Sequence, residues 1–256
     1  MDYSTLFIIG IMGNIAAGLV FLSPIKTFCR IVRRGTTEGF GSAPYVFTLL
    51  NALLWFYYGV TKPDGLLVAT INGFGAVVEL AYVALFIGYA ADQATRLNTI
   101  KWAVVLDIGF TGLVFVVTRF AISELNLRIM VIGIVCACFN IFMYGAPLAA
   151  VRTVITEGSV EFMPLFLSMS LLINGGIWVA YAMLDRDIFL LIPNGIGFIL
   201  GTIQLIVYYF HPSLIYYFNM IFVNRLVPRN GSEAAAGEPQ EEAPLLAPND
   251  RHGQDV

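Results

Sequence analysis

The sequence predicts an all-α integral membrane protein in which seven transmembrane helices form two parallel three-helix repeats joined by the fourth helix. Composition is the first observation, because 58% of the 256 residues are hydrophobic and only 12% are charged. Ordinary soluble domains contain about 45–50% apolar and about 25% charged residues. The second observation is a set of long windows free of charge, and the third is an internal duplication at an offset of 123 residues.

Each predicted helix rests on a window long enough to cross a bilayer, which takes about 20 apolar residues for a hydrocarbon core about 30 Å thick. Four windows contain no charged residue and are each 23 residues long: 3–25, 39–61, 129–151 and 162–184. Three others meet or approach the required length: 65–91, broken only by Glu79; 102–118, broken only by Asp107; and 188–224. We expect His211-Pro212 to end the last helix, because proline lacks a backbone donor and crowds the preceding turn.

The duplication divides these helices into two groups. Matched pairs include Pro24 with Pro147, Asn51 with Asn174, Trp55 with Trp178, Tyr58 with Tyr181 and, after a one-residue loop difference, Asn72 with Asn194. We therefore predict a first repeat at 5–91, a linker helix at 100–119 and a second repeat at 128–210. Because one helix separates the copies, both enter the membrane in the same direction. Parallel repeats of this kind are typical of transporters whose site lies near the middle of the bilayer.

The C-terminal segment 225–256 is rich in Pro, Glu, Ala and Gly and lacks aromatic residues, so we expect a disordered tail. Ten of the 14 Lys and Arg residues lie on the same side as this tail if the N-terminus is non-cytosolic. Basic residues in short loops favour the cytosol. The sequence therefore predicts a non-cytosolic N-terminus and a cytosolic tail.

Few residues could carry out acid–base or metal chemistry inside the membrane. The two histidines are His211, at the end of the last helix, and His252, in the tail. We therefore expect no enzymatic activity, no metal and no cofactor, and no nucleic-acid partner is expected either. Glu79 and Asp107 are lone carboxylates in apolar windows, and such residues either relay protons or ions or form structural hydrogen bonds.

The duplicated amides and indoles are better candidates for a binding site. An asparagine amide offers donors and acceptors without charge, which complements a ligand that carries many hydroxyl groups. Trp55 and Trp178 offer flat apolar faces for the C–H face of a sugar ring. The same amides could instead bond between helices, and the indoles could lie at the bilayer interface.

Four prolines stand near the cytosolic ends of their predicted helices: Pro24, Pro44, Pro147 and Pro164. Proline removes one backbone hydrogen bond and permits a kink. The prolines therefore either act as hinges or mark helix ends without motion.

Four stretches closely resemble the plant SWEET sugar-transporter family: FLSPIKTFCRIVRRGTTEGFGSAPY, LLVATINGFGAVVELAYVALF, EGSVEFMPLFLS and DRDIFLLIPNGIGFILGTIQLIVYY. The resemblance extends over residues 5–210 and implies a 3+1+3 bundle that equilibrates sugar by alternating access and forms homo- or hetero-oligomers with family members. The second repeat looks most like the vacuolar branch, which transports fructose and glucose. Glu241-x-x-x-Leu245-Leu246 also fits an acidic dileucine sorting pattern, so we expect the vacuolar membrane, with the plasma membrane as the alternative.

The resemblance also implies roles for individual residues. Asn72 and Asn194 are expected to bind sugar hydroxyls while Trp55 and Trp178 flank the ring. The four prolines correspond to the family's proline tetrad, and Tyr58 with Asp187 corresponds to its outward gate. Selectivity is expected to depend on Val20, Asn51, Met143 and Asn174. These side chains are bulkier than those of sucrose-transporting members, which favours a monosaccharide such as glucose or fructose.

Two other classes of protein fit part of the sequence. A seven-helix receptor shares the helix number and orientation, but it gives no reason for a parallel duplication with paired Pro, Asn and Trp. A proton-coupled organelle transporter of the PQ-loop type shares the helix arrangement. Here the dipeptides are Pro24-Ile25 and Pro147-Leu148 rather than Pro-Gln.

Overall fold

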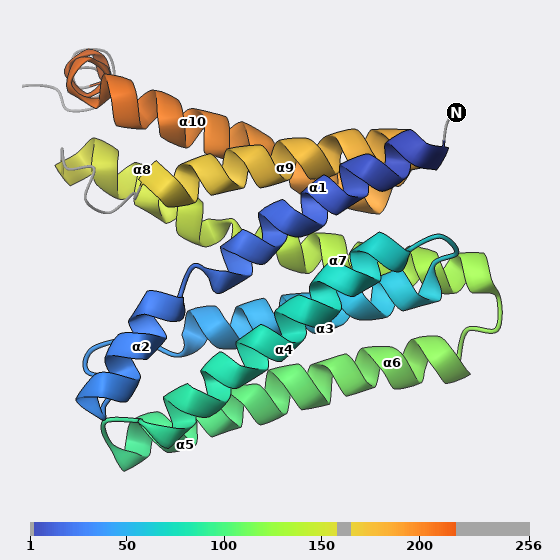
Figure 1. Ribbon diagram of the computed structural model, residues 1–256, viewed down its shortest axis with the longest axis horizontal. Coiled ribbons are helices and arrows are strands. Elements are labelled where there is room, and N and C mark those ends of the chain that lie inside the picture. The colour runs from blue at the N-terminus through green and yellow to red at the C-terminus, as the bar shows by residue number, and fades with distance from the viewer. Residues whose placement is uncertain (1–2, 158–164, 219–256) are drawn as a thin grey trace, which may run out of the picture. The chain divides into compact units, whose positions relative to one another are not determined.

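The computed structural model describes residues 3–157 and 165–218, and the regular structure in these ranges is helical. Within them, seven spans are long and apolar enough to cross a membrane. The first repeat consists of α1 (Tyr3–Leu22) with α2 (Ile25–Arg34), α3 (Ala43–Thr61) and α4 (Leu66–Gly88). The linker span consists of α5 (Gln93–Trp102), η1 (Ala103–Phe110) and α6 (Thr111–Phe120), and the second repeat of α7 (Leu125–Met143) with α8 (Gly145–Glu157), α9 (Leu165–Asp185) and α10 (Ile188–Phe218) (Figure 1). The predicted 3+1+3 fold class is thereby confirmed.

The first span of each repeat is broken at an equivalent place. The break between α1 and α2 spans Ser23 and Pro24, and the break between α7 and α8 is at Tyr144, three residues before Pro147. Because proline has no N–H and crowds the preceding turn, matching prolines give matching breaks. Pro44 lies in the first turn of α3, where a missing N–H is tolerated. Pro164 and the tail 225–256 lie outside the described residues.

The expected break at His211-Pro212 is wrong, because α10 continues through both residues to Phe218. An interior proline costs one hydrogen bond and some crowding of the preceding turn. In membrane helices, neighbouring helices and small local adjustments of the backbone compensate for that loss.

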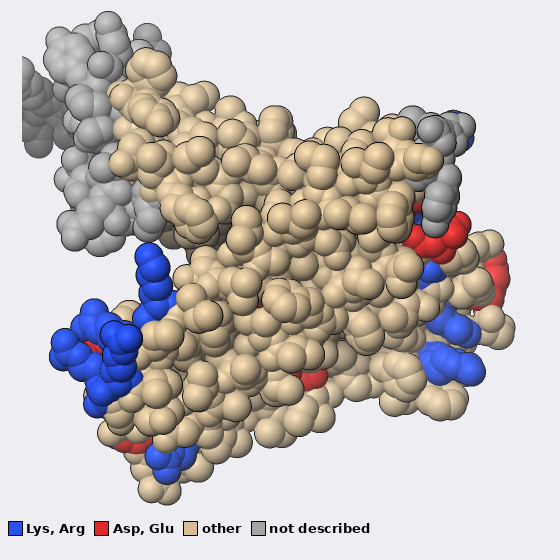
Figure 2. All heavy atoms as spheres, viewed as in Figure 1, with Lys and Arg blue, Asp and Glu red and all other residues tan. Residues whose placement is uncertain are grey.

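The surface has the distribution of charge expected of a membrane protein. Figure 2 shows Lys and Arg gathered at two opposite ends, with a broad surface of other residues between them. Exposed apolar side chains occur on many spans, for example Ile15 on α1, Leu80 on α4 and Phe120 on α6. Such side chains are solvated by lipid rather than by water.

Small residues set the register of the paired helices within each repeat. A Cβ atom added to Gly59 of α3 would lie 2.5 Å from the backbone nitrogen of Ala69 of α4. In the second repeat, a Cβ atom on Gly201 of α10 would lie 2.6 Å from the backbone nitrogen of Leu172 of α9. The helix backbones are therefore in direct contact. These antiparallel pairs fix the positions of the polar residues of each repeat along the helix axes.

Candidate functional site

Four side chains join the two repeats at the end where α3 meets α4 and α9 meets α10. The Tyr58 hydroxyl donates to Asp187 Oδ2 at 2.8 Å, and Lys62 Nζ donates to the same oxygen at 2.6 Å. Lys62 also donates to Asp185. We call these residues, Tyr58, Lys62, Asp185 and Asp187, the latch. The predicted proximity of Tyr58 and Asp187 is present in the structure.

Asp187 also fixes the start of α10. Its Oδ1 accepts from the backbone N–H groups of Phe189 and Leu190 at 3.0 and 3.1 Å, as an N-cap residue does. With only 5% of its surface exposed, this carboxylate is buried and satisfied on both oxygens. A change at Asp187 would therefore disturb both the latch and the helix.

Sequence reasoning missed Lys62 and Asp185. Burial alone would lower the pKa of Lys62, but its hydrogen bonds to Asp185 and Asp187 outweigh burial and hold that pKa above the ordinary value. Lys62 is therefore charged at physiological pH. A signal was available, because Lys62 and Asp185 are 123 residues apart. They occupy equivalent positions in the two repeats and carry opposite charges.

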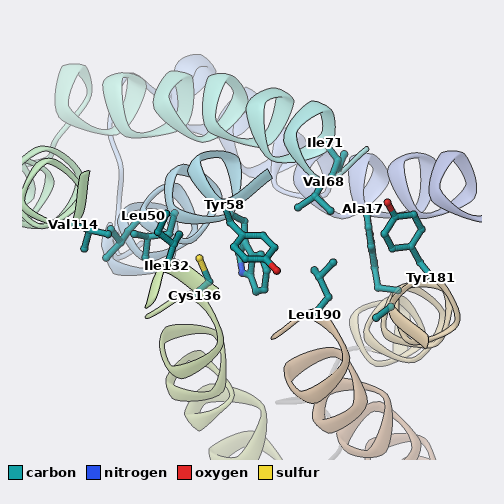
Figure 3. Packing of buried hydrophobic residues seen from close by; sticks show 14 residues of the cluster. Ala17, Leu50, Tyr58, Val68, Ile71, Val114, Ile132, Cys136, Tyr181 and Leu190 are labelled. Carbon is teal, nitrogen blue, oxygen red and sulfur yellow. The ribbon is translucent and has the colours of Figure 1, made fainter. Parts of the chain in front are cut away.

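The matched indoles lie in the main buried cluster. Trp55 packs against Tyr58 with ring centroids 5.4 Å apart, and Trp178 packs against Tyr181 at 5.3 Å, both nearly edge to face. Both indoles are buried, with 4% of the surface of Trp55 and 5% of the surface of Trp178 exposed. Figure 3 shows Tyr58 and Tyr181 in different parts of this cluster, with Leu190 between them in the view. In this conformation the indoles contribute to packing between the repeats.

Asn72 and Asn194 have the same local geometry. Each donates one amide N–H to the carbonyl oxygen four residues earlier, at 2.9 Å to Val68 and at 2.8 Å to Leu190. Both residues are partly exposed. Because a primary amide has two donors and an acceptor oxygen, this bond leaves hydrogen-bonding capacity at equivalent places in the two repeats.

Asn51 and Asn174 are also equivalent. The Oδ1 atom of each is buried and lacks a partner among the described residues. A buried acceptor without a partner costs about 1–3 kcal/mol, and a hydroxyl-bearing ligand would remove that cost. Asn174 lines a cavity of about 350 Å³ together with Val20 and Pro147. Met143 is partly buried and is not among the residues that line this cavity.

Glu79 and Asp107 remain apart from this set. Glu79 on α4 is 3% exposed, and Asp107, in the π-helical segment η1, is 7% exposed. Within the described part of the chain, Glu79 Oε2 and both carboxylate oxygens of Asp107 have no hydrogen-bond partner. Among the described residues, Asp107 therefore has no structural hydrogen bond.

Asn14 is a further polar residue that the repeat pattern did not reveal. Its amide donates to the carbonyl oxygens of Gly10 and Leu67 at 3.0 and 2.8 Å, and its Oδ1 accepts from the Thr70 hydroxyl at 2.9 Å. The equivalent position in the second repeat is Ala137, so a search for matched residues passes over it. Its bonds link α1 to α4.

Known proteins resemble this chain over most of its length. A family model described as "Sugar efflux transporter for intercellular exchange" matches residues 7–94 and 130–214. Bidirectional sugar transporter SWEET17 of Arabidopsis thaliana is 48% identical over 202 residues, which are 79% of this chain and 83% of that protein. SWEET16 of the same plant is 44% identical over 205 residues, 80% of this chain and 89% of that protein. Bidirectional sugar transporter N3 of Medicago truncatula is 37% identical over 249 residues, 97% of this chain and 85% of that protein.

A solved structure of a eukaryotic SWEET transporter is also similar. It is 42% identical in sequence, superposes with a TM-score of 0.77 and covers 81% of this chain and 97% of its own.

Proposed function

The chain belongs to the SWEET family of sugar transporters, and from that premise we propose how its residues carry out transport. It is a multi-pass integral membrane protein and a bidirectional sugar transporter rather than an enzyme. We propose that it equilibrates monosaccharides such as glucose and fructose by alternating access, with the repeats 5–91 and 128–210 moving about the linker helix 100–119.

The observation that carries this proposal is the matched state of the amides. Asn72 and Asn194 each donate to the carbonyl oxygen four residues earlier, and Asn51 and Asn174 each have a buried Oδ1 without a partner among the described residues. Neutral donors and acceptors at matched positions of the two repeats suit a ligand whose hydroxyl groups donate and accept at once. In the proposed sugar-bound state, Trp55 and Trp178 flank the ring.

The latch supports a gating role at one end. Tyr58 and Lys62 of the first repeat hold Asp187 of the second, so sugar cannot pass between the repeats there without breaking buried bonds. The cavity lined by Asn174 lies toward the opposite end, beside Pro147. We propose that the latch is the outward gate, and that the breaks at Pro24 and Pro147, with Pro44 and Pro164, allow the cytosolic ends to move.

Orientation, membrane and assembly complete the proposal. The basic residues favour a non-cytosolic N-terminus and a cytosolic tail. The resemblance of the second repeat to the vacuolar branch supports the vacuolar membrane, and a plasma-membrane location is the alternative. We also propose assembly into homo- or hetero-oligomers with family members, on the same resemblance.

Counterflow in proteoliposomes tests the site directly. Asn72→Ala or Asn194→Ala should remove most exchange of labelled glucose and fructose, because each variant loses the hydrogen bonds that the amide donates to and accepts from the sugar. Asn126→Ala is the matched control, since Asn126 is an exposed amide in the first turn of α7. Wild-type exchange by both site variants, at equal amounts of protein, would exclude these asparagines from the sugar site.

A proton-coupled transporter is the second candidate. Glu79 Oε2 and both carboxylate oxygens of Asp107, which are buried without a partner among the described residues, favour it. The two models differ in energetics, because a uniporter brings sugar to equal concentrations and never concentrates it. We expect a non-metabolised hexose to reach a ratio of one across vesicles with or without a pH gradient. Accumulation that follows the gradient, and is lost in Glu79→Gln or Asp107→Asn, would replace the uniporter model.

A further inference from the structure

The two repeats differ on the proline side of the sugar site. The offset of 122 that relates Asn72 to Asn194 relates Tyr82 of α4 to Gln204 of α10. In the first repeat, Tyr82 stacks on Phe28 with ring centroids 4.3 Å apart and planes at 10°. Tyr45 lies against both rings, at 4.7 Å from Phe28 and 6.0 Å from Tyr82. Three aromatic rings therefore fill this part of the first repeat.

In the second repeat, a cavity lies beside the counterpart of Tyr82. Val151 stands where the duplication places Phe28, and Gln204 stands where it places Tyr82. Two aromatic rings are thereby replaced by a short aliphatic and a linear polar side chain. Val151 packs with Val154 and Val207 and is not among the residues that line the cavity, so the difference at the cavity is that between Tyr82 and Gln204. Gln204 lines the cavity of about 350 Å³, which is bounded by residues of α8, α9 and α10 and by Val20 of α1.

The cavity contains polar atoms without adequate partners. Ser168 is 1% exposed, and its Oγ has no hydrogen-bond partner among the described residues. Gln204 is 5% exposed, and its Nε2 reaches the carbonyl oxygen of Pro147 only at 3.4 Å. Asn174 Oδ1 is the third such atom. None of the described residues that line the cavity is charged.

Helix register places these groups close together. Gly201 of α10 abuts Leu172 of α9, and Gly175 of α9 abuts Phe198 of α10. Extending this antiparallel register by one turn brings Ser168 level with Gln204. Gln204 is ten residues beyond Asn194, which is about 15 Å along a helix. One monosaccharide bound by Asn194 therefore does not reach Gln204.

We propose that Ser168 and Gln204, with Asn174 at the edge nearer the sugar site, form a second sugar subsite found only in the second repeat. This inference rests on the proposed function. A serine hydroxyl can donate and accept, and a glutamine amide offers an acceptor oxygen and a second N–H, so a neutral polyol fits the site better than an ion. Sugar that enters from the proline side binds here before it reaches Asn72 and Asn194.

The proposal predicts that the two faces of the transporter respond differently to the same variant. We would measure the KM for glucose from each face, using vesicles sorted by the orientation of the C-terminus. Ser168→Ala should raise the KM on the proline side about threefold to tenfold, the loss expected for one neutral hydrogen bond. The KM from the latch side should change less than twofold. Because a uniporter does no net work, Vmax/KM stays equal from both faces, so the ratio of the two Vmax values must rise with the ratio of the two KM values.

A variant that fills the cavity with a larger side chain tests the proposed subsite independently. Gln204→Tyr introduces into the cavity lining the aromatic side chain that the first repeat stacks on Phe28 at the equivalent position. It should raise the proline-side KM as Ser168→Ala does. Thr202→Val is the matched control, since the Thr202 hydroxyl bonds to the Phe198 carbonyl oxygen at 2.8 Å and lies outside the cavity lining.

Each outcome decides between the subsite and its rivals. Unchanged KM values in Ser168→Ala, at wild-type transport, would overturn the subsite. An equal fall of Vmax from both faces in Gln204→Met, without a change in either KM, would show that Gln204 only braces Pro147 and would also overturn it. These outcomes differ from the result expected if the proposed function is wrong. In that case wild-type protein would not exchange glucose, and Asn72→Ala would be the same as wild type.

Discussion

Replacing Tyr58 with phenylalanine tests the latch with the smallest available change. The substitution removes one hydroxyl and the 2.8 Å bond to Asp187, and it keeps the ring that packs against Trp55. Lys62 continues to hold Asp187. A net hydrogen bond to a charged group contributes about 1.5–3 kcal/mol. Since the bond exists only while the latch is closed, its loss should raise the open population roughly 10-fold to 150-fold.

Thiol labelling in nanodiscs would measure that population. Leu190 is 3% exposed and its backbone N–H bonds to Asp187, so a cysteine placed there reacts with a maleimide only when the latch opens. The variant Leu190→Cys would be made in a chain with Cys29→Ser and Cys138→Ser, because both natural thiols are exposed. The labelling rate should rise by the same factor as the open population.

Tyr57→Phe is the matched control for this experiment. Its hydroxyl lies 2.9 Å from the Thr118 hydroxyl, a contact between α3 and the linker span rather than between the repeats. It removes the same chemical group from the adjacent residue, and the labelling rate should stay within twofold of the parent. Equal labelling of the Tyr58→Phe and Tyr57→Phe proteins would refute the latch as the barrier at this end.

Three further results are expected. Asn51→Ser with Asn174→Ser should raise the sucrose-to-glucose transport ratio, because it shortens both side chains and keeps a donor and an acceptor at each position; an unchanged ratio would exclude them as the size limit. Gly201→Ala should lower stability by about 1–3 kcal/mol through overpacking, read from the thermal midpoint in detergent, whereas Gly195→Ala, with open space around its Cβ, should not. The raised pKa of Lys62 means that the latch loses its cation only as pH rises above the ordinary lysine value of about 10.4. Because maleimide reacts with the thiolate, the labelling rate of Leu190→Cys is divided by that of a free thiol at the same pH, and this ratio should be constant between about pH 6 and about pH 9.

The fold class could be predicted from sequence because the bilayer imposes a simple length rule. Charge-free windows of 23 residues have few alternatives to spanning helices, and the duplication set their grouping. The helix through Pro212 could not be predicted from propensity, since a membrane environment compensates for a lost backbone bond in ways that a local sequence does not encode. Likewise, nothing in the spacing of Trp55 and Trp178 says that both are buried, because their exposure depends on how the repeats meet.

Some residues of the site can be predicted from their spacing in the sequence, whereas others are identified only by their contacts in the folded protein. Lys62 contributed to the prediction of orientation only as one of 14 basic residues. Counting charges in this way does not indicate that Lys62 pairs with Asp185. Ser168 and Gln204 have no matched partner, so a search for repeated residues passed over them. The packing of the two repeats sets them apart, because Tyr82 is stacked in an aromatic cluster whereas its counterpart Gln204 lines a cavity.

The pseudo-symmetry of parallel repeats suggests why equivalent residues are sometimes alike and sometimes opposite. Residues near the axis that relates the copies face their own counterparts, and equal charges there would repel. At the latch, where the copies touch directly, the equivalent residues are Lys62 and Asp185, and the opposite charges attract. At the proposed sugar site the equivalent residues are identical amides, which can donate to and accept from a ligand held between them. In a duplicated transporter, matched amides therefore indicate a ligand between the copies, whereas matched opposite charges indicate a contact that must break before the ligand can pass.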